Sequence, residues 1–582
     1  MKILKYIFIC GLIVMPFSSC QDFLDVNPKA TLSDDQLNST DNVEKMVIAA
    51  YSLLENDNRN QSPVWYNGMR GGDAYKGGGG TSDMSFAYDL EVAATIKVNS
   101  EDYENKWVRT YVAISRANNV LSRIQNLEVA DYPLKEQRAA EMRFLRAHHH
   151  FQIKELFKHI VWMDETIPQE EVIEQSNRKY TDQELWEKIA DDFREAARVL
   201  PDPDKTDIGR ANKYSAKAYL AKTLLFAAYI QDDQHNVISI DKEKLNEVVQ
   251  LVDEIINSGY YKLNEDFAYN FLYDYENSRE SILAIQSSND DGTPYGRLNQ
   301  YGMLSYPHSK EYGCCGMHLP SQSIVNAFKT DPVTGFPLFD TYQDDKIITG
   351  SDLEKPNRTV DPRLMHTVGI LGRPYKYMPD YLVNSSFIRD SLQYGPFVSM
   401  KETEKFTCSC VTTARWFPGS SLNRDIIRYD EILLWKAEAL IQLDREKEAL
   451  PIINTIRSRA ANSTEQLVMI DPRDSQTKPS ANFHVKPYTD ATWTKEFAWQ
   501  ALQWERRLEF AMESRRGEDL VRWGIAAEEL NKYYEIEQKH RTTSFYNTAK
   551  FTKNKHEYLP IPSKQISFSR GLYVQNYGYE TL

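Results

Sequence analysis

The stretch "RYDEILLWKAEALIQL", residues 428–443, decides the fold class of this chain. Apolar side chains return every three or four residues, as they do on the buried face of an α-helix. The residues that share this broad face are Tyr429, Ile432, Leu433, Trp435, Ala437, Ala439, Leu440 and Leu443. Asp444 and Arg445 interrupt the pattern. The sequence therefore predicts a helix that ends near residue 443.

A second helix is predicted directly afterwards, in "EKEALPIINTIRSRA", residues 446–460. Ile453, Ile456 and Ala460 lie on one face of it. Two short antiparallel helices with small residues at their crossing resemble a tetratricopeptide hairpin, which buries its apolar face only by stacking on neighbours. Further hairpins should therefore exist, and comparable helical patterns occur at residues 136–160, 213–230, 245–259 and 494–523.

Two long stretches do not follow this pattern. Residues 60–100 and 287–425 are rich in Gly, Pro, Asn, Ser and aromatic residues and show no sustained period. They are far longer than ordinary connections, and long irregular segments of this kind usually carry function. The predicted fold is mainly α: a scaffold of tetratricopeptide-like helical hairpins, an α-α superhelix, with an irregular, loop-rich ligand-binding lobe.

The chain begins with an export signal. Lys2 and Lys5 form a short basic region, and an apolar run over residues 7–17 precedes small residues and Cys20. The run is shorter than the roughly 20 residues that cross a bilayer, so it is interpreted as a removable segment. Residues 1–19 resemble a bacterial lipoprotein signal, which would leave a lipid on Cys20 as the only membrane attachment. The alternative is an ordinary secretory signal in which Cys20 has no role.

Charge and aromatic content narrow the possible partners. The formal net charge of -14 at pH 7 argues against nucleic acid or anionic lipid as the main partner. The chain holds 35 tyrosines and 10 tryptophans, many of them in the irregular stretches. These side chains combine a flat apolar face with one polar group, which suits a partly hydrated binding surface.

Four cysteines remain after Cys20, namely Cys314, Cys315, Cys408 and Cys410. An exported chain meets oxidising conditions, so these thiols can pair in any of three connectivities. Their spacing does not resemble the paired cysteines of structural zinc sites. We expect no metal and no cofactor.

Several motifs in a fixed order carry a family resemblance. They include "CQDFLDVNPKATLS" from residue 20, "MRFLRAHHHFQIKELF" from 142, "GRANKYSAKAYLAKTLLF" from 209, "DPRL" from 361, "WERRLEFAMESRRGEDLVRW" from 504 and "YLPIPSKQI" from 558. Each motif alone is weak. Together, behind a lipoprotein signal, they resemble the SusD/RagB family of outer-membrane nutrient-binding lipoproteins over nearly the full length.

The resemblance implies an architecture of four tetratricopeptide-like hairpins capped by the ligand-binding lobe. It divides the chain into a helical N-terminal SusD-like region, 20–230, with the loop insertion 60–100, and a C-terminal RagB/SusD region, 231–582. The lobe would occupy about 287–425 and further hairpins about 426–525. Family members are surface-exposed in the outer membrane, capture oligosaccharides or polysaccharides, and deliver them to a SusC-like TonB-dependent transporter. They are not enzymes.

Two alternatives stay open at this stage. A secreted glycoside hydrolase needs only two well-placed carboxylates, and 83 acidic residues do not exclude it by number. The same architecture could instead bind a peptide or another nutrient. No G-x-S-x-G, Walker A or H-E-x-x-H motif is present, and no catalytic residue is expected. "HHH" at 148–150 is predicted to lie on a helix surface with at most one buried ring, because adjacent helical side chains point about 100° apart.

Three segments supply the candidate carbohydrate-binding residues. Residues 63–83, which end in a glycine tip at 77–80 predicted to be flexible, contain Trp65, Tyr66, Arg70, Asp73, Tyr75 and Asp83. The stretch "YGCCGMHLP", residues 312–320, contains Tyr312, Cys314 and Cys315, and "GRPYKY" adds Arg373 and Tyr375.

The two adjacent cysteines have two interpretations. A vicinal disulfide would form a small, rigid apolar plate for the C–H face of a sugar, in place of a tryptophan that many family members carry there. The alternative is a cross-link from Cys314 and Cys315 to Cys408 and Cys410, which would tie two loops of the lobe together.

Overall fold

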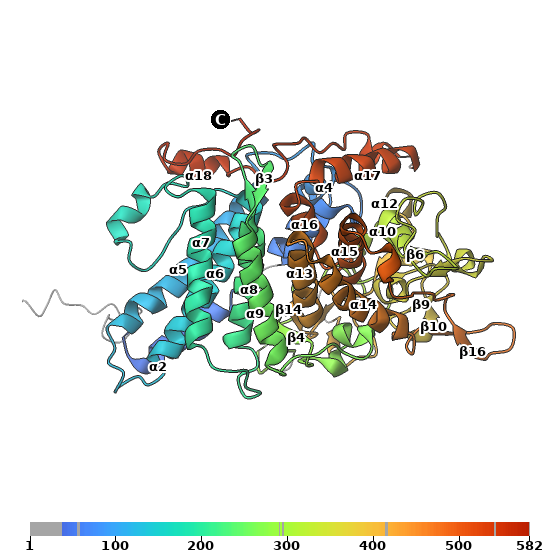
Figure 1. Cartoon of the computed structure of the whole chain (residues 1–582), viewed down its shortest axis with the longest axis horizontal. Helices are drawn as coiled ribbons and strands as arrows, with labels where there is room; N and C mark the ends of the chain where they lie inside the picture. The colour runs from blue at the N-terminus through green and yellow to red at the C-terminus, as the bar shows by residue number, and fades with distance from the viewer. Residues whose placement is uncertain are drawn as a thin grey trace, which may run out of the picture.

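A computed structural model describes residues 38–54, 59–289, 291–293, 296–413, 417–540 and 543–580. The predicted signal and Cys20 lie outside the described residues, so those predictions remain untested. Long helices occupy one end and the middle of the molecule, and a lobe of short elements occupies the other end (Figure 1). Within the described residues, no helix has both the length and the apolar character needed to cross a membrane.

The N-terminal half is a stack of helices. The helices are α2 (Thr40–Tyr51), α5 (Glu101–Gln125), α6 (Lys135–Phe157), α7 (Asp182–Val199), α8 (Lys213–Ala228) and α9 (Lys242–Asn257). Along the chain, α5 packs against α6, α6 against α7, α7 against α8, and α8 against α9. Helix α2 packs against α5 and α6. A capping box at Thr181 and Glu184 starts α7, and the Asn212 side chain accepts hydrogen bonds at the start of α8. The helical patterns predicted at 136–160, 213–230 and 245–259 are confirmed.

The C-terminal half continues the stack. Its helices are α13 (Tyr429–Gln442), α14 (Glu446–Asn462), α15 (Lys495–Glu509), α16 (Arg516–Arg522), α17 (Ala526–His540) and α18 (Ser563–Phe568). Helix α13 packs on α9 as well as on α14 and α15, so it joins the two halves. The predicted hairpin at 428–460 is confirmed, and so is the mainly α fold with an irregular lobe.

The lobe and the remaining connections consist of short elements. The helical ones are α3 (Pro63–Tyr66), α4 (Ser85–Val92), α10 (Gln322–Ala327), α11 (Arg363–Thr367) and α12 (Ser391–Tyr394). The strands form two-stranded antiparallel sheets. The pairs are β1 (Ala74–Gly77) with β5 (Met317–Pro320), β2 (Tyr229–Gln231) with β3 (Val237–Ile240), β4 (Ser281–Ile285) with β14 (Arg424–Arg428), β6 (Lys329–Thr330) with β7 (Thr359–Val360), β8 (Val368–Gly369) with β11 (Val398–Ser399), β9 (Pro374–Tyr375) with β10 (Met378–Leu382), β12 (Val411–Thr412) with β13 (Gly419–Ser420), and β15 (Val468–Ile470) with β16 (Thr477–Pro479).

Candidate functional site

The pairing of β1 with β5 joins the two loops that the sequence singled out. Gly77 lies opposite Met317, and the Gly78 amide donates to the Gly316 carbonyl at 2.9 Å. The segments 63–83 and 312–320 are far apart in the sequence, yet this short sheet places their ends side by side. A single surface therefore contains the glycine tip and the adjacent cysteines.

Hydrogen bonds hold the glycine tip in place. The buried Lys76 ammonium donates to the carbonyls of Gly77 at 2.8 Å, Gly80 at 2.8 Å and Asp83 at 2.6 Å. Burial lowers the pKa of Lys76 to about 8. Gly77 has a φ of 76°, and a Cβ there would lie 2.7 Å from the Gly316 oxygen. Only glycine fits this approach of the two strands, and the tip is pinned rather than the loose loop that the sequence predicted.

The cysteines pair locally. Cys314 is bonded to Cys315, and Cys408 to Cys410, so the cross-link between the two loops is not formed. Cys315 is buried, whereas Cys314 is half-buried and reaches the surface. The Tyr306 carbonyl accepts from the Cys315 amide at 3.3 Å and supports the loop from beneath.

An ion pair lies next to this disulfide. Arg389 Nη2 is 2.9 Å from Asp83 Oδ2, and both side chains remain about one-third exposed, at 31% and 33%. Asp83 also accepts from the Gly79 amide at 3.0 Å. Arg389 Nη1 lies 3.5 Å from the Cys315 carbonyl oxygen. The pair fixes one carboxylate and one guanidinium at the edge of the disulfide.

Three further side chains complete the surface. Tyr381 on β10 is half-buried, and its hydroxyl donates to Glu311 Oε2 at 2.8 Å. This hydrogen bond lowers the pKa of Glu311. His308 is exposed, and its amide donates to the Phe387 carbonyl at 3.0 Å. We name the whole set the disulfide face: Asp83, His308, Glu311, Cys314, Tyr381 and Arg389.

The disulfide face combines the groups that recognise sugars. A ring and a sulfur provide apolar contact, while a carboxylate, a guanidinium and an imidazole provide donors and acceptors around it. Of the predicted residues, only Asp83 and Cys314 belong to it. The sequence did not single out Tyr381 and Arg389, which lie in a stretch without any period.

The structure corrects the prediction of direct ligand contact for five residues of the first loop: Trp65, Tyr66, Arg70, Asp73 and Tyr75. Each is at most 9% exposed. The Trp65 indole nitrogen donates to the Arg59 carbonyl at 2.9 Å, and the Tyr66 hydroxyl donates to Gln61 Oε1 at 3.0 Å. Rings without an exposed face cannot stack on a sugar.

The other buried groups of this loop connect it to segments that are distant in the sequence. Arg70 donates to the carbonyl of Glu557 at 2.6 Å. Asp73 Oδ1 accepts from Arg507 Nε at 2.9 Å, and the Tyr75 hydroxyl lies 3.0 Å from both carboxylate oxygens of Glu537. These side chains position the glycine tip and do not form its surface.

Tyr312, Cys315, Arg373 and Tyr375 are corrected in the same way, because each is at most 5% exposed. The Tyr312 hydroxyl donates to the Glu404 carbonyl at 2.8 Å. Arg373 Nε donates to the Ser480 carbonyl at 2.8 Å, and the Tyr375 hydroxyl lies 2.7 Å from Thr403 Oγ1. The Tyr312 and Tyr375 rings, 5.8 Å apart, support the disulfide face from inside.

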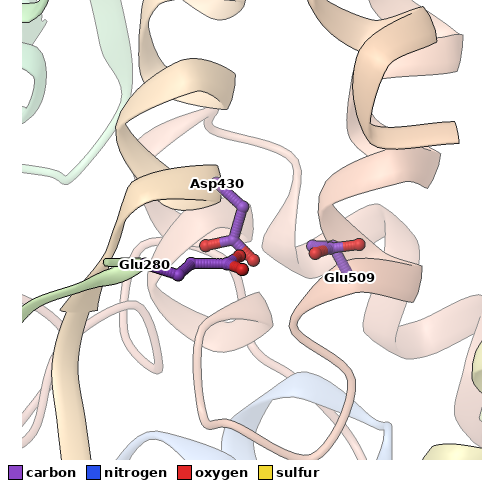
Figure 2. Close-up of side chains that lie close together, drawn as sticks. All are labelled: Glu280, Asp430 and Glu509. Atoms are coloured by element: carbon purple, nitrogen blue, oxygen red, sulfur yellow. The ribbon is translucent and has the colours of Figure 1, made fainter. Parts of the chain in front are cut away.

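A second cluster of chemically active groups lies between β4, α13 and α15. Glu280, Asp430 and Glu509 are fully buried, and their carboxylate oxygens lie within 4.8 Å of one another (Figure 2). Three carboxylates at this spacing could in principle hold a cation. In this structure, the guanidinium groups of buried arginines supply the positive charge beside these carboxylates.

Arg459 Nη1 contacts both oxygens of Glu280 at 3.1 Å, and the same guanidinium donates to Glu509. Arg363 Nη1 lies 2.7 Å from Glu509 Oε2. Burial raises the pKa of Glu509, but the charges of Arg459 and Arg363 more than offset it and lower the pKa overall. Burial raises the pKa of Asp430 well above its usual value. The cluster is an ion-paired core of the scaffold.

The histidine run at 148–150 is also part of the interior. All three rings are at most 3% exposed, because α6 is covered by α5 on one side and by α7 on the other. The His150 ring stacks on Trp162 at 4.3 Å, and its Nε2 accepts from the Met163 amide at 3.2 Å. Burial lowers the pKa of His150 to about 3. The prediction of at most one buried ring is wrong.

Two family models match the chain. The model described as the SusD family matches residues 279–579, and one described as starch-binding and associating with the outer membrane matches residues 22–225. The first alone covers more than half of the sequence. The chain belongs to the SusD family.

Relatives of known name agree with this. A SusD-like protein P25 of Formosa agariphila is 22% identical over 97% of this chain and 96% of its own length. A SusD-like protein of Bacteroides ovatus is also 22% identical, but the match covers 46% of this chain and 47% of that protein.

Solved structures show the same fold. A SusD-like protein from Bacteroides fragilis superposes with a TM-score of 0.70 at 19% identity, over 94% of this chain and 99% of its own. Surface glycan-binding protein A from Bacteroides thetaiotaomicron in complex with laminarihexaose superposes with a TM-score of 0.63 at 18% identity, over 92% of this chain and 99% of its own. These structures confirm the SusD architecture.

Proposed function

We propose that this SusD family protein captures a neutral oligosaccharide on its disulfide face. The observation that carries the proposal is the convergence of the glycine tip and the vicinal disulfide into one exposed surface with polar groups beside it. The laminarihexaose complex of the related surface glycan-binding protein A supports a sugar as the ligand class. The Asp83 and Arg389 charges neutralise each other, which favours a neutral ligand.

The contribution of the disulfide can be estimated from its size. Covering about 80 to 100 Å² of apolar surface with a sugar ring contributes roughly 2 kcal/mol before ordering costs, or about thirtyfold in affinity. Cys314 and Tyr381, both half-buried, would supply this apolar contact. The ion pair adds hydrogen bonds to ring hydroxyls and selects their orientation.

The test is affinity electrophoresis on a panel of neutral polysaccharides, followed by calorimetry with a hexasaccharide of the retained polymer. The double variant Asp83→Ala, Arg389→Ala should bind at least tenfold more weakly. Its matched control is Arg194→Ala, which removes an exposed ion pair on α7. Unchanged affinity in the double variant would refute the assignment of this surface.

We also propose that the protein acts by binding alone and has no turnover. A glycoside hydrolase needs two accessible carboxyl groups, about 5 to 9.5 Å apart, around the scissile bond. The carboxylates of the Glu280 cluster are fully buried and paired with arginines. On the disulfide face, Asp83 is ion-paired with Arg389 and Glu311 accepts from the Tyr381 hydroxyl, so both carboxylates are already engaged. Release of reducing sugar at catalytic rates by the purified protein would favour the hydrolase alternative instead.

The remaining steps of the proposal concern location and partner. A lipid on Cys20 would hold the protein in the outer membrane, and the family model described as associating with that membrane supports this location. A SusC-like TonB-dependent transporter would receive the captured ligand. Co-purification of a large barrel protein after gentle detergent extraction is the expected result, and recovery of this protein alone would contradict it.

A further inference from the structure

A groove runs along α5, on the helical scaffold. Its volume is about 780 Å³, within the usual range for small-molecule sites. Figure 1 shows α5 at the end of the molecule opposite to β9 and β10 of the lobe. The groove is therefore separate from the disulfide face. The opposite wall is the segment 161–172, and Gln565 and Tyr573 close one end.

One stripe of α5 forms the floor. Val108, Val112, Ser115, Asn119 and Ser122 follow one another at three or four residues, so they share a face of the helix over roughly 20 Å. The two valines are unusually exposed for apolar side chains, at 41% and 44%. The floor is thus apolar at one end and polar at the other.

Aromatic rings surround the apolar end. The Trp107 ring lies 5.2 Å from Tyr111 and 6.2 Å from Tyr573, measured between centroids. Tyr111 and Tyr573 are half-buried and line the groove. Their rings can receive the C–H face of a ligand beside the valine side chains.

Neutral polar groups at the other end have no hydrogen-bond partner within the part of the chain that the structure describes. Among the described residues, no hydrogen bond involves the side chains of Ser115, Asn119 or Gln169. A hydroxyl and two amides together offer both hydrogen-bond donors and hydrogen-bond acceptors. Such a set matches the hydroxyl groups of a sugar.

The charged side chains of the groove already have hydrogen-bond or ion-pair partners. Glu165 is paired with Arg146. Asp164 accepts from Trp162 Nε1 at 2.8 Å, and Arg116 donates to the Ala49 carbonyl at 2.9 Å. Each of these charged groups is therefore already engaged in a contact within the protein.

We propose that the groove along α5 is a second binding site for a neutral oligosaccharide, independent of the disulfide face. It goes beyond the capture role proposed for that face. Two sites on one molecule would hold a long polysaccharide at two points, and linked sites raise the overall affinity without any new contact.

The test uses the full chain and a panel of neutral hexasaccharides built from glucose, mannose or xylose. The groove variant is Ser115→Glu, Asn119→Arg, which fills the groove with two long side chains. A Glu four residues before an Arg forms an ion pair that stabilises the helix. The matched control is Asn246→Glu, Gln250→Arg, which places the same pair at the same spacing on the exposed side of α9. Calorimetry with the disulfide-face variant, Asp83→Ala, Arg389→Ala, isolates binding in the groove.

We expect one panel member to bind the disulfide-face variant. Adding the groove substitutions to that variant should weaken this binding at least tenfold, and adding the control substitutions should leave it unchanged. Methyl resonances of Val108 and Val112 should shift in a saturable way during the titration. A panel in which no sugar shifts these resonances would overturn the proposal. If the disulfide-face variant abolishes all binding and the groove variant has no effect, the groove proposal is overturned and the proposed function stands. If the groove variant abolishes all binding and the disulfide-face variant has no effect, the groove proposal stands and the proposed function is overturned.

Discussion

Replacing Arg459 with methionine tests the ion-paired core of the scaffold. This guanidinium contacts Glu280, Asp430 and Glu509, and the side chains of all three carboxylates are 0% exposed. Water cannot take over the lost contacts at such depth. Removing one partner of a buried ion pair typically costs about 3 to 5 kcal/mol, because part of the opposite charge stays behind, with only Arg363 and Arg428 as its remaining partners.

The expected loss of unfolding free energy corresponds to a measurable fall in the thermal midpoint. For a chain of this length, the unfolding entropy makes about 3 to 5 kcal/mol equivalent to a fall of roughly 3 to 4 °C in the thermal midpoint. Circular dichroism during heating, supported by urea titration, measures this change. The control is Arg198→Met on α7, whose partner Glu195 lies at the surface, and its midpoint should not move.

A second variant checks the cause. Adding Glu509→Gln to Arg459→Met removes one of the charges left behind, so the double variant should be more stable than Arg459→Met alone. A fall in midpoint no larger than that of Arg198→Met would refute the reasoning, since it would mean that Arg363 and Arg428 compensate the three carboxylates without Arg459.

Three further predictions concern the disulfide face and the pH dependence of stability. Cys314→Ser, Cys315→Ser should weaken sugar binding tenfold to a hundredfold with little change in unfolding, because the bond closes no long loop; calorimetry that shows normal binding would contradict the role of the sulfur plate. Gly77→Ala should lower the thermal midpoint and abolish sugar retention in affinity gels, because its Cβ meets the backbone of Gly316; a normal midpoint would contradict the close approach. The pKa of His150 is about 3 in the folded protein and about 6.5 when unfolded, so its contribution to stability is lost as the pH falls below 6.5. His150→Gln should flatten the dependence between pH 6.5 and 4 by up to about 1.4 kcal/mol per pH unit in urea titrations, and an unchanged slope would contradict the neutral buried ring.

The sequence predicted the scaffold because a helix repeats its buried face every few residues. The period of residues 428–460 therefore revealed α13 and α14 without any tertiary information. The histidines of α6 show the limit of the same rule. Adjacent side chains point in different directions, but neighbouring helices cover several sides of α6, and only the stacking of helices determines that all three rings are buried.

The site was harder to predict, because composition does not tell which side of a loop faces the solvent. Tyr75 and Arg70 have the residue types of a sugar-binding site, yet their partners come from segments 462 and 487 positions away in the chain. Because of those contacts, the side chains of the aromatic loop are buried in the core. The exposed groups Arg389 and Tyr381 lie in an irregular stretch, and only the fold brings Arg389 to Asp83.

The most direct test of the central claim is the crystal structure of the protein in complex with the hexasaccharide that it binds best. We predict a sugar ring in van der Waals contact with Cys314 and Tyr381, with hydroxyls bonded to Asp83 or Arg389. A ligand bound elsewhere on the lobe, with the disulfide face left open to solvent, would contradict the account.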